Sequence, residues 1–208
     1  MPVFYQQQMN EDTRLGVWKI EETEEFFKGN VPVHREVTHP HKRLQHLAGR
    51  FLLQYLFPDF PYELIAIADT RKPYLPNEQY HFSISHCGDY AAAIVSRSGR
   101  VGIDVEEPKP RIIQVGPKFT SLEELKRLTK REPSTLMTDP ELLTLVWSVK
   151  ESVFKWYGLG GVDFRDDIRL LERDENGQEI GCLFQKLNME LRVGYEVLDG
   201  VVCSWIIS

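Results

Sequence analysis

The segment from Tyr80 to Glu106 constrains the fold most, because it contains three short extended stretches separated by tight turns. YHFSISH (80–86) alternates apolar and polar residues, which is typical of a half-buried strand. YAAAIVS (90–96) and VGIDVE (101–106) are two further strands, with Cys87-Gly88-Asp89 and Ser98-Gly99 as the turns. The segment therefore predicts an antiparallel meander of three strands.

Two long helices are expected outside this segment. Apolar residues recur at helical spacing from His41 to Leu56, and Pro58 ends that helix. A second helix follows Asp139-Pro140 and runs to about Tyr157. Among the shorter elements, residues 16–20 are expected to form a strand and residues 194–207 a closing hairpin. Acidic helix starts are expected in residues 21–29 and 120–124. Helices together with antiparallel strands indicate an α+β fold.

Size and composition set the broad class. The chain has 208 residues, which is enough for one core or for two small halves that share one. Its formal charge of −6 is mildly unfavourable for nucleic-acid binding. Cys87, Cys182 and Cys203 lie far apart without metal spacing. The first residues lack a signal-peptide pattern, and no stretch is long and apolar enough to span a membrane. We expect a soluble, cytoplasmic protein with no nucleic-acid or membrane partner.

The strand VGIDVE carries two acidic residues. Residues two apart on a strand face the same side, so Asp104 and Glu106 project together while Ile103 and Val105 face the core. Paired carboxylates are typical magnesium ligands. The alternative is a solvated strand end with a basic partner, and the spacing by itself favours this alternative.

The long second helix carries a separate stripe of Trp147, Glu151 and Lys155, spaced four apart. Glu151 and Lys155 can be a plain surface ion pair, or a third metal-reaching carboxylate beside a cation for phosphate or proton transfer. Ser85 and His86 end the first strand before a glycine turn, where side chains and backbone N–H groups can bind phosphate oxygens. Together the three elements supply the parts needed to handle a pyrophosphate.

Three motifs in order carry a family resemblance. FSISH (82–86), GIDVE (102–106) and WSVKESVFKWYG (147–158) resemble the signature motifs of 4′-phosphopantetheinyl transferases. The length is similar to that of the monomeric, surfactin-synthetase-activator type. The resemblance implies two similar α/β halves related by a pseudo-twofold axis, each with a small antiparallel sheet packed on a long helix. It also implies an N-terminal half, 1–104, on the coenzyme A side, and a C-terminal half, 105–208, that completes the metal site and contacts the carrier.

The resemblance implies a role for each matching residue. The metal ligands fall on Asp104, Glu106 and Glu151, for Mg²⁺ with Mn²⁺ as the alternative. The residues implied to bind coenzyme A are Lys72, Ser85, His86, Lys150, Arg43 and Arg50. Lys72 belongs to the Lys72-Pro73 pair, and Lys150 to the Lys150/Lys155 pair. Arg43 and Arg50 lie in KRLQHLAGR, where His46 or Lys42 are the alternatives to the arginines. Arg71 stands where many relatives have glycine.

The implied reaction transfers the 4′-phosphopantetheine arm of coenzyme A to a serine of an apo acyl or peptidyl carrier protein and releases 3′,5′-ADP. Glu151, or a water on the metal, would be the base, and Lys155 would stabilise or protonate the departing phosphate. An acidic carrier would dock on the basic residues Lys118, Lys126, Arg127, Lys130 and Arg131. The rival readings are a non-catalytic docking module, another magnesium-dependent phosphodiester enzyme, and a structural or nucleic-acid-binding protein.

Overall fold

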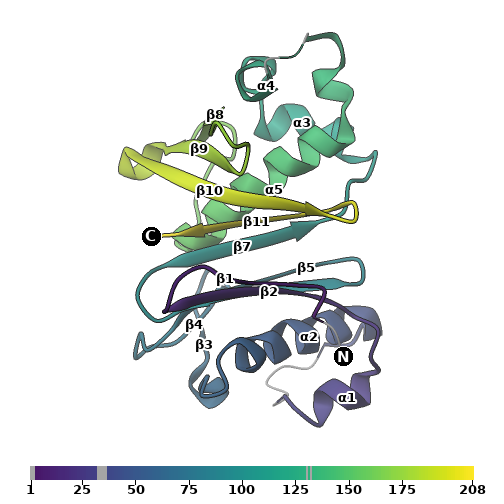
Figure 1. Ribbon diagram of the computed structural model, residues 1–208, viewed down its shortest axis with the longest axis vertical. Helices are drawn as coiled ribbons and strands as arrows, with labels where there is room; N and C mark the ends of the chain where they lie inside the picture. Colours follow the sequence, from purple (N-terminus) through teal and green to yellow (C-terminus); the bar gives the residue numbers. More distant parts are fainter. Residues whose placement is uncertain (1–2, 32–36, 130, 132) are drawn as a thin grey trace.

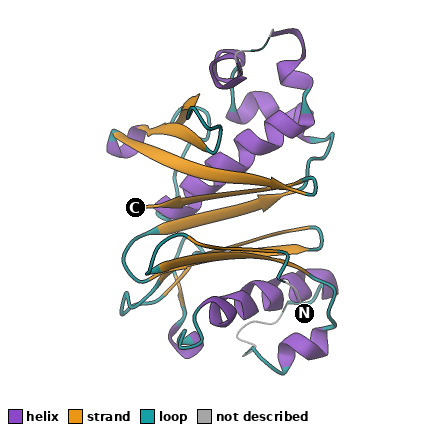
Figure 2. Cartoon of the chain, viewed as in Figure 1, coloured by secondary structure: helices purple, strands orange, loops and turns teal. Residues whose placement is uncertain are grey.

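Two antiparallel sheets lie face to face in the computed structural model, and a long helix covers the outer face of each sheet (Figures 1 and 2). The structure describes residues 3–31, 37–129, 131 and 133–208. Side chains from both sheets fill the space between them, and two further apolar clusters lie beneath the helices. The architecture is α+β with two similar helix-covered sheets, as the resemblance implied.

The first sheet and its covering elements come from the N-terminal half. Its strand order is β1-β2-β6-β5, with a separate two-stranded ribbon, β3-β4. The strands are β1 (Tyr5–Gln8), β2 (Thr13–Lys19), β3 (Ala66–Ile67), β4 (Pro73–Tyr74), β5 (His81–Cys87) and β6 (Tyr90–Ser96). The helices are α1 (Glu24–Lys28), α2 (Pro40–Leu56) and the short 3-10 helix η1 (Tyr62–Leu64).

The second sheet is built mostly from the C-terminal half, with strand order β7-β11-β10-β9-β8. The strands are β7 (Val101–Glu106), β8 (Ile168–Arg173), β9 (Glu179–Phe184), β10 (Met189–Leu198) and β11 (Val201–Ile207). The helices are α3 (Ile112–Phe119), α4 (Leu122–Thr129), α5 (Pro140–Tyr157) and the 3-10 helices η2 (Pro133–Thr138) and η3 (Gln185–Leu187). None of the helices in the described residues is both long and apolar enough to cross a membrane.

Both long helices have the ends that the sequence predicts. Pro40 and Pro140 lie in the first turns of α2 and α5, where the missing N–H of proline costs nothing. The Asp139 carboxylate accepts a hydrogen bond from the backbone N–H of Leu142. Gly158 ends α5 with a φ of 72°, a conformation that glycine adopts without strain.

The prediction of a three-strand meander from Tyr80 to Glu106 is wrong for its last strand, β7. β5 and β6 pair as predicted, but β7 pairs with β11 in the other sheet. The turn at Ser98-Gly99 does not determine the partner of the strand that follows it, whereas burial on both faces of β7 does. The free edge of β7 meets β5 through a side chain, since the Ser83 hydroxyl accepts a hydrogen bond from the Ile103 N–H at 3.2 Å. The boundary expected at residue 104 lies within β7 and stays a prediction.

β7 and α5 approach one another at backbone distance. A Cβ atom added to Gly102 would lie 2.0 Å from the Ser152 carbonyl oxygen and 2.8 Å from the Trp156 nitrogen. On β7, Ile103 and Val105 belong to the apolar layer between the sheets. Since side chains alternate along a strand, Asp104 and Glu106 face α5. The glycine thus allows the close packing that brings α5 over the two carboxylates.

Prediction one concerns this contact. Gly102→Ala forces α5 away from β7, and we expect the free energy of unfolding to fall by about 3 kcal/mol, as for an overpacked core. Gly29→Ala is the matched control, because a Cβ atom at Gly29 meets its nearest atoms at 3.6 and 3.7 Å. The control should change stability by less than about 0.5 kcal/mol. Urea unfolding of both variants measures the difference, and equal stability of the two would contradict a tight α5–β7 contact.

Candidate active site

One face of α5 closes over the acidic side of β7. The Lys155 ammonium lies 2.6 Å from Asp104 Oδ1 and donates to the Ser85 hydroxyl at 2.8 Å. Ser85 Oγ in turn donates to Asp104 Oδ1 at 2.8 Å. Asp104 is only 2% exposed, and among the described residues its second oxygen, Oδ2, is buried without a hydrogen-bond partner. Residues from β5, β7 and α5 therefore meet at one carboxylate.

Two further carboxylates lie within electrostatic reach of Asp104. Burial raises the pKa of Glu151 to about 7, the negative charges of Asp104 and Glu106 contribute, and the Lys155 ammonium opposes the shift. Burial also raises the pKa of Glu106, and the charge of Asp104 adds to this effect. Hydrogen bonds from Cys87 and Trp147 to Glu106 act in the opposite direction. Three carboxylates thus share a poorly hydrated site with one ammonium group.

This donor set suits a divalent cation. In the part of the chain that the structure describes, no three His, Cys, Asp or Glu side chains already form a metal-ligand cluster. The chemistry of the site nevertheless fits a hard cation, because the Asp104 Oδ2 atom is buried without a partner among the described residues, and burial together with the charge of Asp104 raises the pKa values of Glu106 and Glu151. Mg²⁺ prefers such carboxylate oxygens and leaves room for phosphate oxygens. The residues present therefore fit the metal that the family resemblance implies.

A cavity of about 600 Å³ lies on the β5 side of this site, between α2 and the β3-β4 ribbon. Its polar lining consists of basic side chains, namely Lys28, Arg43, His46, Arg50, Arg71 and His86. The His46 and His86 rings stand edge to face with centroids 5.2 Å apart. Burial, helped by the charges of His46 and Lys155, lowers the pKa of His86. The cavity presents basic groups to a ligand beside Ser85.

Arg43 and Arg50, which the resemblance implied as coenzyme A contacts, lie two turns apart on α2 and both line this cavity. The two arginines differ in their partners. Arg43 forms a two-fold contact with the Glu24 carboxylate, at 2.7 and 2.9 Å. The Arg50 Nη1 atom is buried, and within the described residues it has no hydrogen-bond partner. Burial lowers the pKa of Arg50. Arg50 therefore presents a buried guanidinium nitrogen that an anion in this cavity could pair with.

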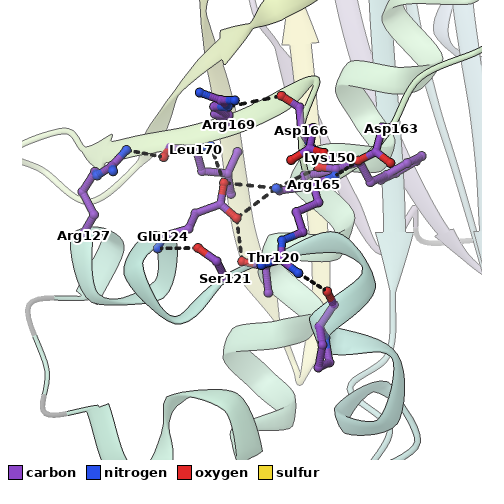
Figure 3. Close-up of polar contacts among 12 residues, drawn as sticks. Thr120, Ser121, Glu124, Arg127, Lys150, Asp163, Arg165, Asp166, Arg169 and Leu170 are labelled. Carbon is purple, nitrogen blue, oxygen red and sulfur yellow. Dashed lines mark hydrogen bonds and ion pairs between the residues drawn. The ribbon is translucent and has the colours of Figure 1, made fainter.

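The structure does not bring Lys150 into either region. Its side chain is fully buried in the C-terminal half, with Nζ at 2.9 Å from Glu124 Oε2 and 2.9 Å from the Phe164 carbonyl oxygen (Figure 3). Burial lowers its pKa, while the charge of Glu124 opposes the shift. A position five residues before Lys155 lies on a different face of the helix. Lys150 therefore anchors the interior of this half.

Lys72 lies near the end of α5. Its ammonium donates to the carbonyl oxygens of Lys155 at 2.5 Å and Trp156 at 3.5 Å. Burial lowers the pKa of Lys72 to about 8. A charged group on the last carbonyls of α5 caps the negative end of that helix. Lys72 lines a smaller cavity of about 270 Å³, separate from the one that contains Arg50.

Sequence reasoning missed two features of the site. Trp147 was predicted only as part of a stripe, but it stacks on Phe164 with centroids 5.2 Å apart, and its indole acts to lower the pKa of Glu106. The sequence signal for a place in the site was its position four residues before Glu151, which puts both side chains on one face of the helix. Arg71 has a φ of 66°, in the left-handed region that favours glycine. This conformation explains why a glycine suits the position.

Comparison with known proteins now identifies the family. The model of the 4′-phosphopantetheinyl transferase superfamily matches residues 100–205, just over half of the chain. The chain therefore belongs to this superfamily. The matched segment contains β7 and α5, which supply Asp104, Glu106 and Glu151.

Three curated relatives are similar over part of their length. Enterobactin synthase component D of Escherichia coli K12 is 37% identical over 119 residues, which cover 55% of this chain and 54% of the relative. A 4′-phosphopantetheinyl transferase of Bacillus subtilis is 36% identical over 95 residues, 45% of this chain and 41% of the relative. The 4′-phosphopantetheinyl transferase AcpT of Escherichia coli O157:H7 is 29% identical over 119 residues, 56% of this chain and 59% of the relative. The chain spans about half the length of the curated relatives it matches.

Prediction two tests the burial of Glu151. A folded-state pKa of about 7, above the ordinary 4.5, means that protonation favours the folded state. This contribution is complete below pH 4.5 and is lost as the pH rises through about 7. Without divalent metal, Glu151→Gln should therefore be more stable than the wild type at about pH 8.5, on the order of 2 kcal/mol, and nearly equal at about pH 5.

Urea unfolding at the two pH values in the presence of a chelator measures this difference. Glu141→Gln, an exposed position on the same helix, is the control and should follow the wild type at both pH values. A constant difference between Glu151→Gln and the wild type would show that Glu151 titrates as an ordinary carboxyl group.

Proposed function

We propose that this protein transfers the 4′-phosphopantetheine moiety of coenzyme A to a serine of an apo acyl or peptidyl carrier protein and releases 3′,5′-ADP. The observation that carries the proposal is the meeting of Asp104, Glu106 and Glu151 with Lys155, next to a cavity of basic side chains. Superfamily membership supports the same reaction. We further propose a monomer of the surfactin-synthetase-activator type, acting in the cytoplasm.

Asp104, Glu106 and Glu151 are the proposed ligands of Mg²⁺, with Mn²⁺ as the alternative. The bound ion would neutralise the diphosphate of coenzyme A and fix its geometry. The buried Asp104 Oδ2 atom and the raised pKa values of Glu106 and Glu151 support this ligand set.

Glu151 is the proposed general base for the carrier serine. A water on the metal is the alternative base, because a bound dication would lower the proton affinity of a carboxylate that holds it. Lys155 is the proposed acid or electrostatic partner of the departing phosphate. Its hydrogen bond to Ser85 fixes the ammonium at the β5 end of the site. Ser85 and His86 would hold phosphate oxygens by charge-assisted hydrogen bonds.

Arg50 is the proposed main contact for the 3′-phosphate, with Arg43 beside it. The buried Arg50 Nη1 atom supports this assignment, whereas Arg43 already pairs with Glu24. A coenzyme A role for Lys72 and Lys150 stays a prediction, because both ammonium groups donate to other parts of the protein. We keep 1–104 as the proposed coenzyme A half and 105–208 as the half that completes the metal site.

The proposed docking surface for an acidic carrier lies on α3 and α4. Lys118, Lys126 and Arg127 are exposed on these helices, and Arg131 is exposed just after α4. Lys130, predicted in the same cluster, lies outside the described residues. Exposed basic side chains steer an acidic partner and set the rate of encounter more than the final affinity.

Prediction three tests the reaction. Incubation with coenzyme A, Mg²⁺ and a panel of apo carrier proteins should add the mass of one phosphopantetheine to at least one carrier, and a chelator should prevent it. Asp104→Ala and Glu151→Gln should each lower the rate by about 100-fold or more, whereas Glu141→Gln should not. Mass spectrometry of the carrier measures the product. Near-normal rates in both folded variants would remove the assignment of the carboxylates.

Prediction four tests Arg50. Wild-type protein should bind coenzyme A more tightly than the analogue that lacks the 3′-phosphate, because an arginine–phosphate pair is charge-assisted. In Arg50→Gln this preference should shrink by about tenfold, a change of about 1.4 kcal/mol in the coupling between residue and phosphate. Isothermal titration calorimetry with both ligands measures the four affinities. Lys186→Gln, remote on η3, is the control. An unchanged preference in Arg50→Gln would assign the 3′-phosphate elsewhere.

A further inference from the structure

A second basic cavity lies in the C-terminal half, between the start of α4 and β8 with the loop before it. Its volume is about 280 Å³. The lining residues that carry charge in the opening are Glu123, Arg127, Arg165, Asp166 and Arg169. Figure 3 shows the three arginines and the polar contacts beneath them. The Asp104 site is built from β5, β7 and α5, so this cavity has different walls.

Each of the three arginines is held by a backbone carbonyl group. Arg165 Nη1 donates to the Pro117 oxygen at 3.0 Å, and Arg169 Nε donates to the Asp166 oxygen at 3.2 Å. Arg127 Nη1 lies 3.4 Å from the Leu170 oxygen. In the part of the chain that the structure describes, no ion pair joins these guanidinium groups to a carboxylate. Most of their donors therefore remain available for a ligand.

Hydrogen bonds centred on Glu124 join the elements beneath the cavity. The Glu124 carboxylate accepts hydrogen bonds from Thr120 Oγ1 at 2.5 Å, from the Leu170 N–H at 2.6 Å and from Lys150 (Figure 3). These bonds tie α4 to β8 and to α5 in the interior. Because Lys150 compensates the charge of Glu124, this carboxylate does not neutralise the arginines. The network also holds the elements that carry Arg127 and Arg169 in fixed positions.

Two acidic residues reduce the positive charge at the opening. Glu123 and Asp166 line the cavity, so three guanidinium groups face two carboxylates there. Asp163 also acts on Arg165, although its carboxylate accepts hydrogen bonds from the backbone N–H groups of Arg165 and Asp166. The first turn of α4 adds backbone N–H groups that the helix cannot satisfy internally. With Asp163 included, three carboxylates balance the three guanidinium charges, so an anion here would be held by the guanidinium donors and not by an excess of positive charge.

We propose that this arginine cavity is a second anion site, which binds a small phosphate-bearing ligand independently of the coenzyme A cavity. Planar guanidinium forks match phosphate oxygens in pairs, and three forks around one concave space favour a compact oxyanion over an extended chain. The volume of about 280 Å³ suits a ligand of this size. The inference goes beyond the proposed transfer reaction and does not depend on it.

Inorganic pyrophosphate, titrated calorimetrically into the full chain in the presence of a chelator, is the probe. Wild-type protein should bind it at two sites, one in each basic cavity. Arg50→Gln should remove the site in the coenzyme A cavity and retain the second. Adding Arg165→Gln and Arg169→Gln should weaken the remaining site by about tenfold or more. Arg111→Gln with Arg192→Gln, two exposed positions with the same loss of charge, is the matched control and should retain both sites.

Three results would overturn the proposal. If Arg50→Gln abolishes all binding, the probe binds only in the coenzyme A cavity. If the Arg165/Arg169 variant binds as the wild type does, the arginines do not form a site. If the control variant loses binding equally, the attraction is a general effect of charge. Thermal unfolding of every variant checks that it is folded, and the transfer assay is not needed for any of these results.

Discussion

The site depends on the close contact between α5 and β7 at Gly102. Only a residue without a side chain lets the helix backbone approach the strand so closely, since a Cβ atom there would lie 2.0 Å from the Ser152 carbonyl oxygen. This approach brings Lys155 to Asp104 at 2.6 Å. The same contact joins residues that are 51 positions apart in sequence. A small displacement of α5 would separate the ammonium group from the carboxylate and open the site to water.

Burial makes the acidic cluster electrostatically unfavourable by itself. Asp104, Glu106 and Glu151 share one ammonium, and the pKa values of both glutamates are raised, mainly through the loss of hydration. A fold selected for stability alone would avoid such an arrangement, which supports the proposal that the cluster holds a cation. The neighbouring cavity has the opposite character, because Arg50 there lacks an anionic partner among the described residues. A cation at the carboxylates and an anionic group at Arg50 would each relieve one of these two conditions.

The two lysines of the WSVKESVFKWYG motif have different surroundings, although they lie on one helix. Lys155 faces β7 and contacts Asp104 and Ser85. Lys150 faces the interior and pairs with Glu124, and this network in turn supports the three arginines of the second basic cavity. Similarity of sequence therefore identifies the motif, whereas the helical rotation between the two positions decides which lysine lies beside Asp104 and which is buried beside Glu124. Superfamily membership rests on the matched segment 100–205, and the assignments of single residues rest on these contacts.

The sequence by itself determined the local elements and the residue types of the site. Periodicity located α2 and α5, alternation put Asp104 and Glu106 on one face of a strand, and the motifs selected Ser85, Glu151 and Lys155. Tertiary structure decided which strand pairs with β7, that Lys150 is fully buried, and that Arg43 pairs with Glu24 whereas Arg50 does not. The physical reason is range: helix and strand periodicity act between residues a few positions apart, whereas strand partners, burial and ion pairs depend on segments that only the folded chain brings together.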